Sequence, residues 1–177
     1  MHSMKRRPRI TLRGPSLVCG RRASSDPVVY SLEYDDVRSI LAHVCDELAR
    51  MEGVEFLVRS FHQAAWPVSV DVDLAVLLEQ LPSAVTAVRQ GGSFVIDFFA
   101  QGIERVLRFE RQEDMYRVTC VSREAGWVPQ WDVEWIVRSE LRDMLSALSI
   151  EFLRLARARC PEDVCHPWFV DWSKAVS

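Results

Sequence analysis

The sequence has no long hydrophobic run, although 49% of its 177 residues are hydrophobic. A helix that crosses a membrane needs roughly 18 or more consecutive apolar residues, and no stretch of the chain approaches that length. A secretory signal places an apolar stretch behind its basic residues, and the longest such stretch near the N-terminus is Leu17-Val18-Cys19. We therefore expect a cytoplasmic protein without a membrane partner.

Cysteine is too sparse for a disulfide scaffold, because five residues are few and odd in number. This usage is typical of reduced thiols in a cytosol. Cys160, Cys165 and His166 lie within seven residues of one another, but a zinc site needs four well-placed ligands, usually as two short pairs. The chain has no second pair with that spacing, and it lacks the common phosphate-loop, dinucleotide, nucleophile-elbow and metalloprotease motifs. We therefore assign no catalytic residue, no metal ligand and no cofactor.

Acidic residues are absent from positions 1–25, which hold seven of the 22 basic side chains. The other 152 residues carry the remaining 15 basic groups against all 25 acidic ones. We expect a basic, flexible leader at 1–25 followed by a single acidic domain at 26–177, a length that suits one domain. A basic leader can bind nucleic acid, but the acidic body repels phosphate, so we do not expect a nucleic-acid partner.

Hydrophobic periodicity predicts a mixed α and β chain. Apolar residues at helical spacing indicate an amphipathic helix over 35–51, with Asp35 as its N-cap. A second helix is expected from Leu74, kinked at Pro82 and ending at Gly91. Short runs rich in β-branched and aromatic residues predict strands at 28–34, 54–61 and 68–72.

The clearest signal is a three-stranded meander at about 93–122. Its strands are expected near 94–99, 103–111 and 115–122, joined by two-residue turns at Gln101-Gly102 and Glu113-Asp114. With these turns, alternation places the apolar residues of all three strands on one face. Asp97 then lies on the other face, diagonal to Arg108, with which we expect it to pair.

A long C-terminal helix is predicted over about 133–159. Asp132 would cap it, and its apolar stripe would cover the sheet. The expected fold class is therefore α+β, with an antiparallel sheet covered by this helix and by the earlier one.

Candidate binding residues come from three places. Asp71 and Asp73 would lie roughly 7 Å apart on one strand face. Glu113 and Asp114 occupy an exposed turn. Trp127 and Trp131 cluster at the entrance to the long helix, and tryptophan is frequent both in cores and in binding hot spots. Either the C-terminal aromatic tail covers these side chains as a satellite core, or they form an exposed surface for a partner.

The acidic body, the sequence Asp71-Val72-Asp73 and the meander from Phe94 to Cys120 together resemble bacterial toxin-immunity proteins. The resemblance is architectural and implies a cytosolic inhibitor that occludes the active site of a cognate toxin, often a basic nuclease domain. Two alternatives stay open: a small enzyme with a site near Asp71, Asp73 and His62, and a nucleic-acid binder that uses the leader. A homodimer is also compatible with the long amphipathic helix.

Overall fold

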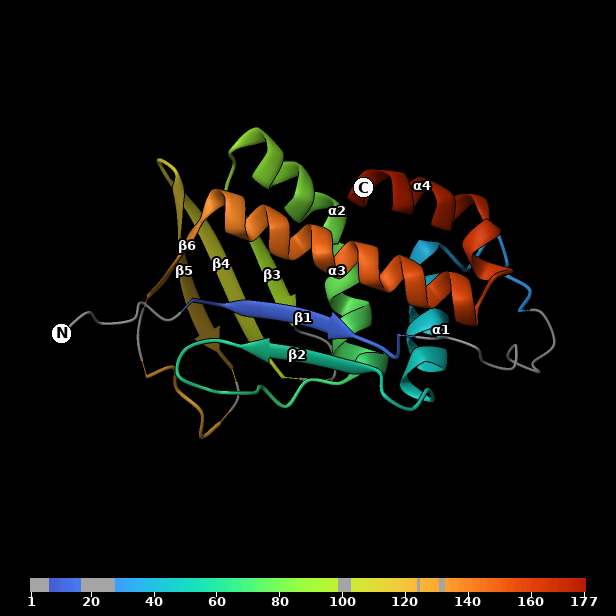
Figure 1. The fold of residues 1–177 in the computed structure, drawn as a ribbon, viewed down its shortest axis with the longest axis horizontal. Coiled ribbons are helices and arrows are strands. Elements are labelled where there is room, and N and C mark those ends of the chain that lie inside the picture. Colours follow the sequence, from blue (N-terminus) through green and yellow to red (C-terminus); the bar gives the residue numbers. More distant parts are fainter. Residues whose placement is uncertain (1–6, 17–27, 99–102, 124, 131–132) are drawn as a thin grey trace.

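The computed structural model describes residues 7–16, 28–98, 103–123, 125–130 and 133–177. Within these residues the fold is α+β, as the sequence predicts (Figure 1). The larger sheet is antiparallel with the order β3 (Phe94–Phe98), β4 (Arg105–Gln112), β5 (Met115–Ser122) and β6 (Glu134–Val137). A smaller antiparallel sheet pairs β1 (Arg9–Arg13) with β2 (Glu55–Arg59). The helices are α1 (Val37–Ala49), the short π-helix η1 (Val70–Leu74), α2 (Ala75–Gln90), α3 (Arg138–Arg159), the 3-10 turn η2 (Asp163–Cys165) and α4 (Pro167–Val176).

One hydrophobic core joins the helices to both sheets. The inner face of the larger sheet supplies Leu107, Phe109 and Val118, and these pack in the same buried cluster as Leu81 of α2 and Leu148 of α3. Helix α3 crosses the molecule beside β1, which lies between α3 and β2 (Figure 1). None of the helices among the described residues is long and apolar enough to cross a membrane.

The meander has the predicted register. Gln112 pairs with Met115, so Glu113-Asp114 is a two-residue turn. Phe94 pairs with Phe109, the register that a two-residue link between β3 and β4 produces, although Gln101-Gly102 itself lies outside the described residues.

The predicted pair between Asp97 and Arg108 is wrong. The Asp97 carboxylate instead lies 3.4 Å from the guanidinium of Arg123. The backbone of Asp97 is bonded through both its N–H and its carbonyl to the side-chain amide of Gln80, at 2.8 and 2.9 Å. Asp97 therefore joins α2 to the outer edge of β3.

The C-terminal helix begins later than predicted. The first five positions of the expected helix, 133–137, largely form β6, and Ile136 pairs with Tyr116 while Glu134 pairs with Val118. Asp132, the predicted cap, lies outside the described residues. The helix α3 itself has 22 residues, a length of about 33 Å.

Two other predicted strands are absent from the described structure. Residues 28–31 have no regular structure and 32–34 form a turn, while 68–69 lead into η1, which includes 70–72. Two side-chain bonds cap the start of η1: Val72 N donates to Ser69 Oγ at 3.3 Å, and Ser69 N donates to Asp73 Oδ2 at 2.8 Å. This capping arrangement satisfies helix N–H groups, and it overrides the β propensity of the valines.

The first helix and the leader also need correction. Asp36, one residue after the predicted cap, accepts a bond from Arg38 N at 2.8 Å and is the N-cap of α1. The predicted flexible leader includes Arg9–Arg13, which form β1 with Ile10 and Leu12 buried. The folded body therefore includes residues well before position 26.

The second helix and the C-terminal tail pack closely. Pro82 lies inside α2, which changes direction along its length (Figure 1), and Gly91 ends the helix with φ of 74°. Trp172 of α4 is buried and donates from Nε1 to the carbonyl of Leu78 at 3.0 Å. The aromatic tail therefore joins the main core against α2, and it does not cover the region of Trp127 as one of the two alternatives proposed.

Candidate functional site

Asp71 and Asp73 do not form a pair on a strand face. Both lie in η1, where Asp71 is exposed and Asp73 is buried. The Asp73 carboxylate accepts bonds from Ser69 N at 2.8 Å and from Ile103 N at 3.4 Å. Asp73 is therefore occupied in holding the start of the helix against the sheet, and Asp71 alone remains available at the surface.

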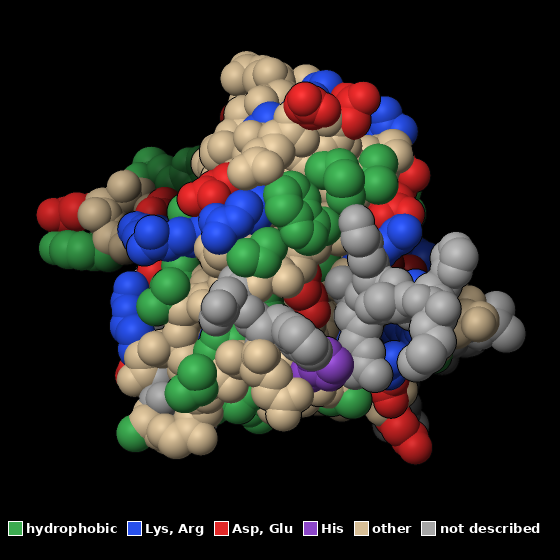
Figure 2. All heavy atoms as spheres, turned by 90° about the vertical axis from the view of Figure 1, so that its left-hand side faces the viewer, with side chains coloured by type: hydrophobic (Ala, Val, Ile, Leu, Met, Phe, Trp, Pro, Cys, Tyr) green, Lys and Arg blue, Asp and Glu red, His purple; other side chains and the backbone are tan. Residues whose placement is uncertain are grey.

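Glu113 and Asp114 form the tip of the β4–β5 hairpin, at the opposite end of the molecule from α1 (Figure 1). Asp114 is almost fully exposed and lies 3.4 Å from the guanidinium of Arg111. Figure 2 faces this end, and on its coloured part basic and acidic side chains are interspersed. The hairpin acids are thus accessible, but they do not belong to a surface of one charge.

Trp127 is half-buried against other aromatic and charged groups. Its ring lies 3.5 Å from the guanidinium carbon of Arg105 and 5.8 Å from the ring of Trp66. Arg105 is only 1% exposed. Trp127 is thus a packing residue of a cation–π cluster, whereas Trp131 lies outside the described residues.

Buried polar groups fix the loop after β2 to the sheet. Glu134 accepts bonds from Ser60 Oγ at 2.6 Å and from Phe61 N at 2.7 Å, and Arg105 donates to Gln63 Oε1 at 2.7 Å. Phe61 and the exposed His62 both have positive φ, 51° and 63°, a conformation that costs non-glycine residues energy. The buried bonds compensate for this strain.

The charges of Arg105 and Glu134 also act on a neighbouring thiol. Burial raises the pKa of Cys120 to about 12; the positive charge of Arg105 opposes this rise, and the negative charge of Glu134 adds to it. Arg105 and Glu134 link the loop after β2 to the larger sheet; His62 lies in that loop, whereas Asp71 and Asp73 lie in η1.

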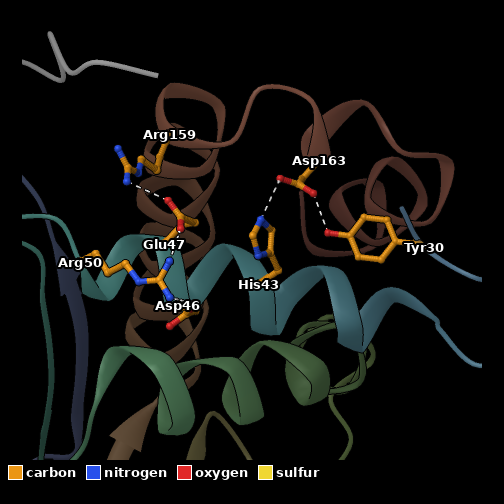
Figure 3. Close-up of polar contacts among 7 residues, drawn as sticks. All are labelled: Tyr30, His43, Asp46, Glu47, Arg50, Arg159 and Asp163. Carbon is orange, nitrogen blue, oxygen red and sulfur yellow. Dashed lines mark hydrogen bonds and ion pairs between the residues drawn. The ribbon is translucent and has the colours of Figure 1, made fainter. Parts of the chain in front are cut away.

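A second polar cluster joins residue 30 and α1 to the turn after α3 (Figure 3). The phenol of Tyr30 donates to Asp163 Oδ1 at 2.6 Å, and His43 Nε2 lies 3.7 Å from Asp163 Oδ2. Burial raises the pKa of Tyr30 well above its ordinary value, and the bond to Asp163 raises it further. Asp163 is therefore the point at which three separate segments of the chain meet.

The same face of α1 carries a buried carboxylate held by two arginines. Glu47 lies 2.5 Å from Arg50 and 2.8 Å from Arg159, and Arg50 also reaches Asp46 at 2.6 Å (Figure 3). A buried carboxylate needs such partners to remain charged. This cluster fixes the end of α3 on α1.

Glu79, on the neighbouring helix α2, is less well compensated. Burial raises the pKa of Glu79 on α2, the charge of Asp36 raises it as well, and Arg38 opposes the shift. Burial also raises the pKa of Cys45 well above its usual range, and the charges of Asp71 and Glu79 contribute to that shift. Asp36, Asp71 and Glu79 therefore place negative charge along α1, η1 and α2, and we call these three residues the acidic flank.

The segment 28–36, which leads into α1, exposes large apolar side chains. Val29, Leu32 and Tyr34 are 89%, 86% and 82% exposed. Glu33, Asp35 and Asp36 lie among or directly after them. The apolar residues of this segment predicted a strand, and their exposure was not predicted; their density next to three acids is the signal in the sequence that indicates it.

The environments of Cys160, Cys165 and His166 differ. Cys160 is buried, which raises the pKa of its thiol to about 12, and Cys165 is exposed. His166 Nδ1 accepts a bond from Trp168 N at 3.3 Å, and its ring packs on Tyr30 and Trp168. Over the described ranges, no group of three or more histidine, cysteine, aspartate or glutamate side chains is placed to hold a metal ion.

Comparison of the chain with protein-family models, with curated proteins and with solved structures finds no match.

Proposed function

We propose that this protein is a binding inhibitor of the immunity type, which covers the active site of a basic toxin domain. The observation that carries the proposal is the excess of acidic over basic side chains in the body. From residue 7, where the described structure begins, the chain has 25 acidic against 20 basic side chains. Asp71 and Glu79 of the acidic flank belong to this excess, whereas Asp36 is paired with Arg38 at 2.7 Å.

Complementary charge suits rapid inhibition. A surface of one sign accelerates encounter with a partner of the opposite sign and selects against partners of like sign. A nuclease domain carries positive charge because it must bind phosphate, so an acidic inhibitor competes directly for its active-site surface. In this proposal Asp71 is a contact residue and the acidic flank is the first part of the molecule that the partner meets.

The other candidate contacts differ in whether they can reach a partner. Asp73 is not a contact, because it is buried and bonded within the fold. Glu113 and Asp114 remain candidates for a peripheral contact only, since the hairpin tip lies at the opposite end of the molecule from α1 (Figure 1). Trp127 supports the core beside Arg105.

The test is capture of the tagged protein, in its full length, from the cells that produce it, at about 0.15 M salt, where charges within roughly 8 Å still interact. We expect one stoichiometric protein with a basic domain, which harms cells when expressed alone and is harmless when co-expressed with this chain. A captured partner that is acidic, or whose harmful effect persists on co-expression, would contradict the proposal.

Charge reversal locates the contact. Asp71→Lys should slow association with the captured partner by about tenfold or more. Asp143→Lys is the matched control, because Asp143 is also exposed to solvent, on α3, and the substitution changes the net charge by the same amount. Equal slowing by both variants would show that only the overall charge matters, and it would remove Asp71 from the interface.

A further inference from the structure

The exposed apolar residues of the described chain are unevenly distributed. Eight large hydrophobic side chains are exposed, and Val28, Val29, Leu32 and Tyr34 supply half of them from seven consecutive positions. Single exposed apolar residues are ordinary, whereas a concentrated patch marks an interaction site more often. The concentration of these exposed side chains therefore indicates a binding surface.

The segment that carries the patch is held in place. Tyr30 lies at its centre and points inward, with its hydroxyl 2.6 Å from Asp163 and its ring edge-on to His166 at 5.5 Å. The turn that follows is closed by Asp35: its backbone N–H donates to the Ser31 carbonyl at 2.8 Å, and its carboxylate accepts from Ser31 N at 2.8 Å. The exposed side chains are thus presented by an ordered turn, which lowers the entropy lost on binding.

The charge beside the patch selects the partner. Residues 28–36 contain Glu33, Asp35 and Asp36 and no basic residue. Asp36 is paired with Arg38 at 2.7 Å, so the excess charge beside the patch comes from Glu33 and Asp35. A second copy of the chain would bring another acidic body to this surface, and an anionic membrane would repel it. A protein surface with an apolar recess rimmed by arginine or lysine complements it.

We infer that Val29, Leu32 and Tyr34 are the apolar anchor of an interface with a basic protein domain, presented by the Tyr30–Asp163 contact and bordered by Glu33, Asp35 and Asp36. The inference rests on the proposed function and adds where the partner binds. Tyrosine is a favoured hot-spot residue, so Tyr34 is expected to contribute most of the three. Tyr30 is a positioning residue, because its hydroxyl faces Asp163 and not the partner.

The first experiment places a photo-crosslinking phenylalanine analogue in the full-length chain, in the cells that produce it. One protein carries it at Tyr34, and the control carries it at Ile150, an exposed apolar position on α3. We expect an adduct from position 34 and none from position 150, and the adduct should contain the same basic protein that the tagged chain captures. An adduct from position 150 alone would overturn the inference.

The second experiment measures affinity for that captured protein. The triple variant Val29→Ser/Leu32→Ser/Tyr34→Ser should lose about 100-fold or more in affinity, since each hot-spot residue commonly accounts for tenfold or more. The matched control Val95→Ser/Val121→Ser/Ile150→Ser removes exposed apolar side chains from other surfaces and should change affinity by less than about threefold. Equal urea midpoints for the two variants and the unmodified chain confirm that both remain folded.

The outcomes separate the two proposals. If the triple variant binds the captured protein as tightly as the unmodified chain, this inference is wrong while the inhibitor function stands. If the unmodified chain captures no basic partner, the proposed function fails and the inference fails with it. If the unmodified chain sediments as a dimer and the triple variant as a monomer, the patch serves self-association, and the inference is overturned.

Discussion

Removing the Glu134 carboxylate should strongly destabilise the fold. Glu134 is 5% exposed and accepts bonds from Ser60 Oγ and Phe61 N at 2.6 and 2.7 Å. Hydrogen bonds to a charged group contribute about 1.5–3 kcal/mol each. Loss of both bonds would also leave the buried Phe61 N–H without its acceptor, which adds to the cost. We therefore expect Glu134→Ala to lower the free energy of unfolding by about 3–5 kcal/mol, a large part of the roughly 5–15 kcal/mol typical of a domain.

Urea unfolding followed by tryptophan fluorescence measures this loss. With a denaturant slope of about 2 kcal/mol per molar, the midpoint should fall by roughly 2 M. Glu134→Gln keeps one acceptor oxygen, so it should lose about half as much. Glu110→Ala, at an exposed position on the same sheet, is the control and should stay within about 0.5 kcal/mol of the unmodified protein. Equal stability of the Glu134→Ala and Glu110→Ala variants would refute the argument that the buried carboxylate holds the loop.

Three further predictions concern the helices and the Tyr30 anchor. Because the pKa of Tyr30 is raised in the folded protein, its stabilising contribution is present below about pH 10, the ordinary tyrosine value, and is lost as the pH rises further. The difference in urea midpoint between the unmodified protein and Tyr30→Phe should therefore shrink between pH 8 and strongly alkaline pH. A constant difference would contradict this. Glu79→Gln should be more stable than the unmodified protein at pH 7, because the raised pKa of Glu79 means that its charged carboxylate destabilises the folded state there. The gain should vanish at pH values low enough to protonate Glu79 in both the folded and the unfolded state. A loss of stability at pH 7 would show that the charge is compensated. Trp172→Phe should lower the free energy of unfolding by about 1–3 kcal/mol, because it removes the bond to the Leu78 carbonyl and leaves a void. Trp168→Phe, at a half-buried site, should lower it less. The reverse order in thermal unfolding would contradict the assigned packing.

The meander could be predicted because its own alternation determines its register. Moving Met115–Ser122 by one residue would turn Tyr116, Val118 and Cys120 away from the core, and the structure keeps all three buried. The helices α1 and α2 were predictable for a similar reason, since their apolar stripes and the Gly91 cap are local features.

The errors occurred where a distant partner decides the structure. Residues 134–137 fit the start of a helical stripe as well as a strand, and only pairing with β5 makes them β6. Ile10 and Leu12 alternate with charged or polar residues in a segment dominated by arginine, so their burial between β2 and α3 was not apparent. At η1, a side-chain cap from Ser69 overrode a pattern of alternating valines.

The candidate site was only partly predictable for the same reason. Asp71 emerged from the sequence as an exposed acid, and the structure places it near α1 with Glu79. The segment 28–36 was recognised as apolar and β-prone, but its exposure depends on Tyr30 reaching Asp163, 133 residues away in the sequence. A long-range contact of a single hydroxyl leaves no periodic signal.

The most direct test of the account is the activity of the captured partner while this protein is titrated into it. Occlusion of a basic active site predicts that activity falls to zero at one equivalent, and that the triple variant at Val29, Leu32 and Tyr34 needs a much higher concentration to reach the same inhibition. A partner that keeps its full activity in the saturated complex would contradict the account, because binding would then leave the active site open.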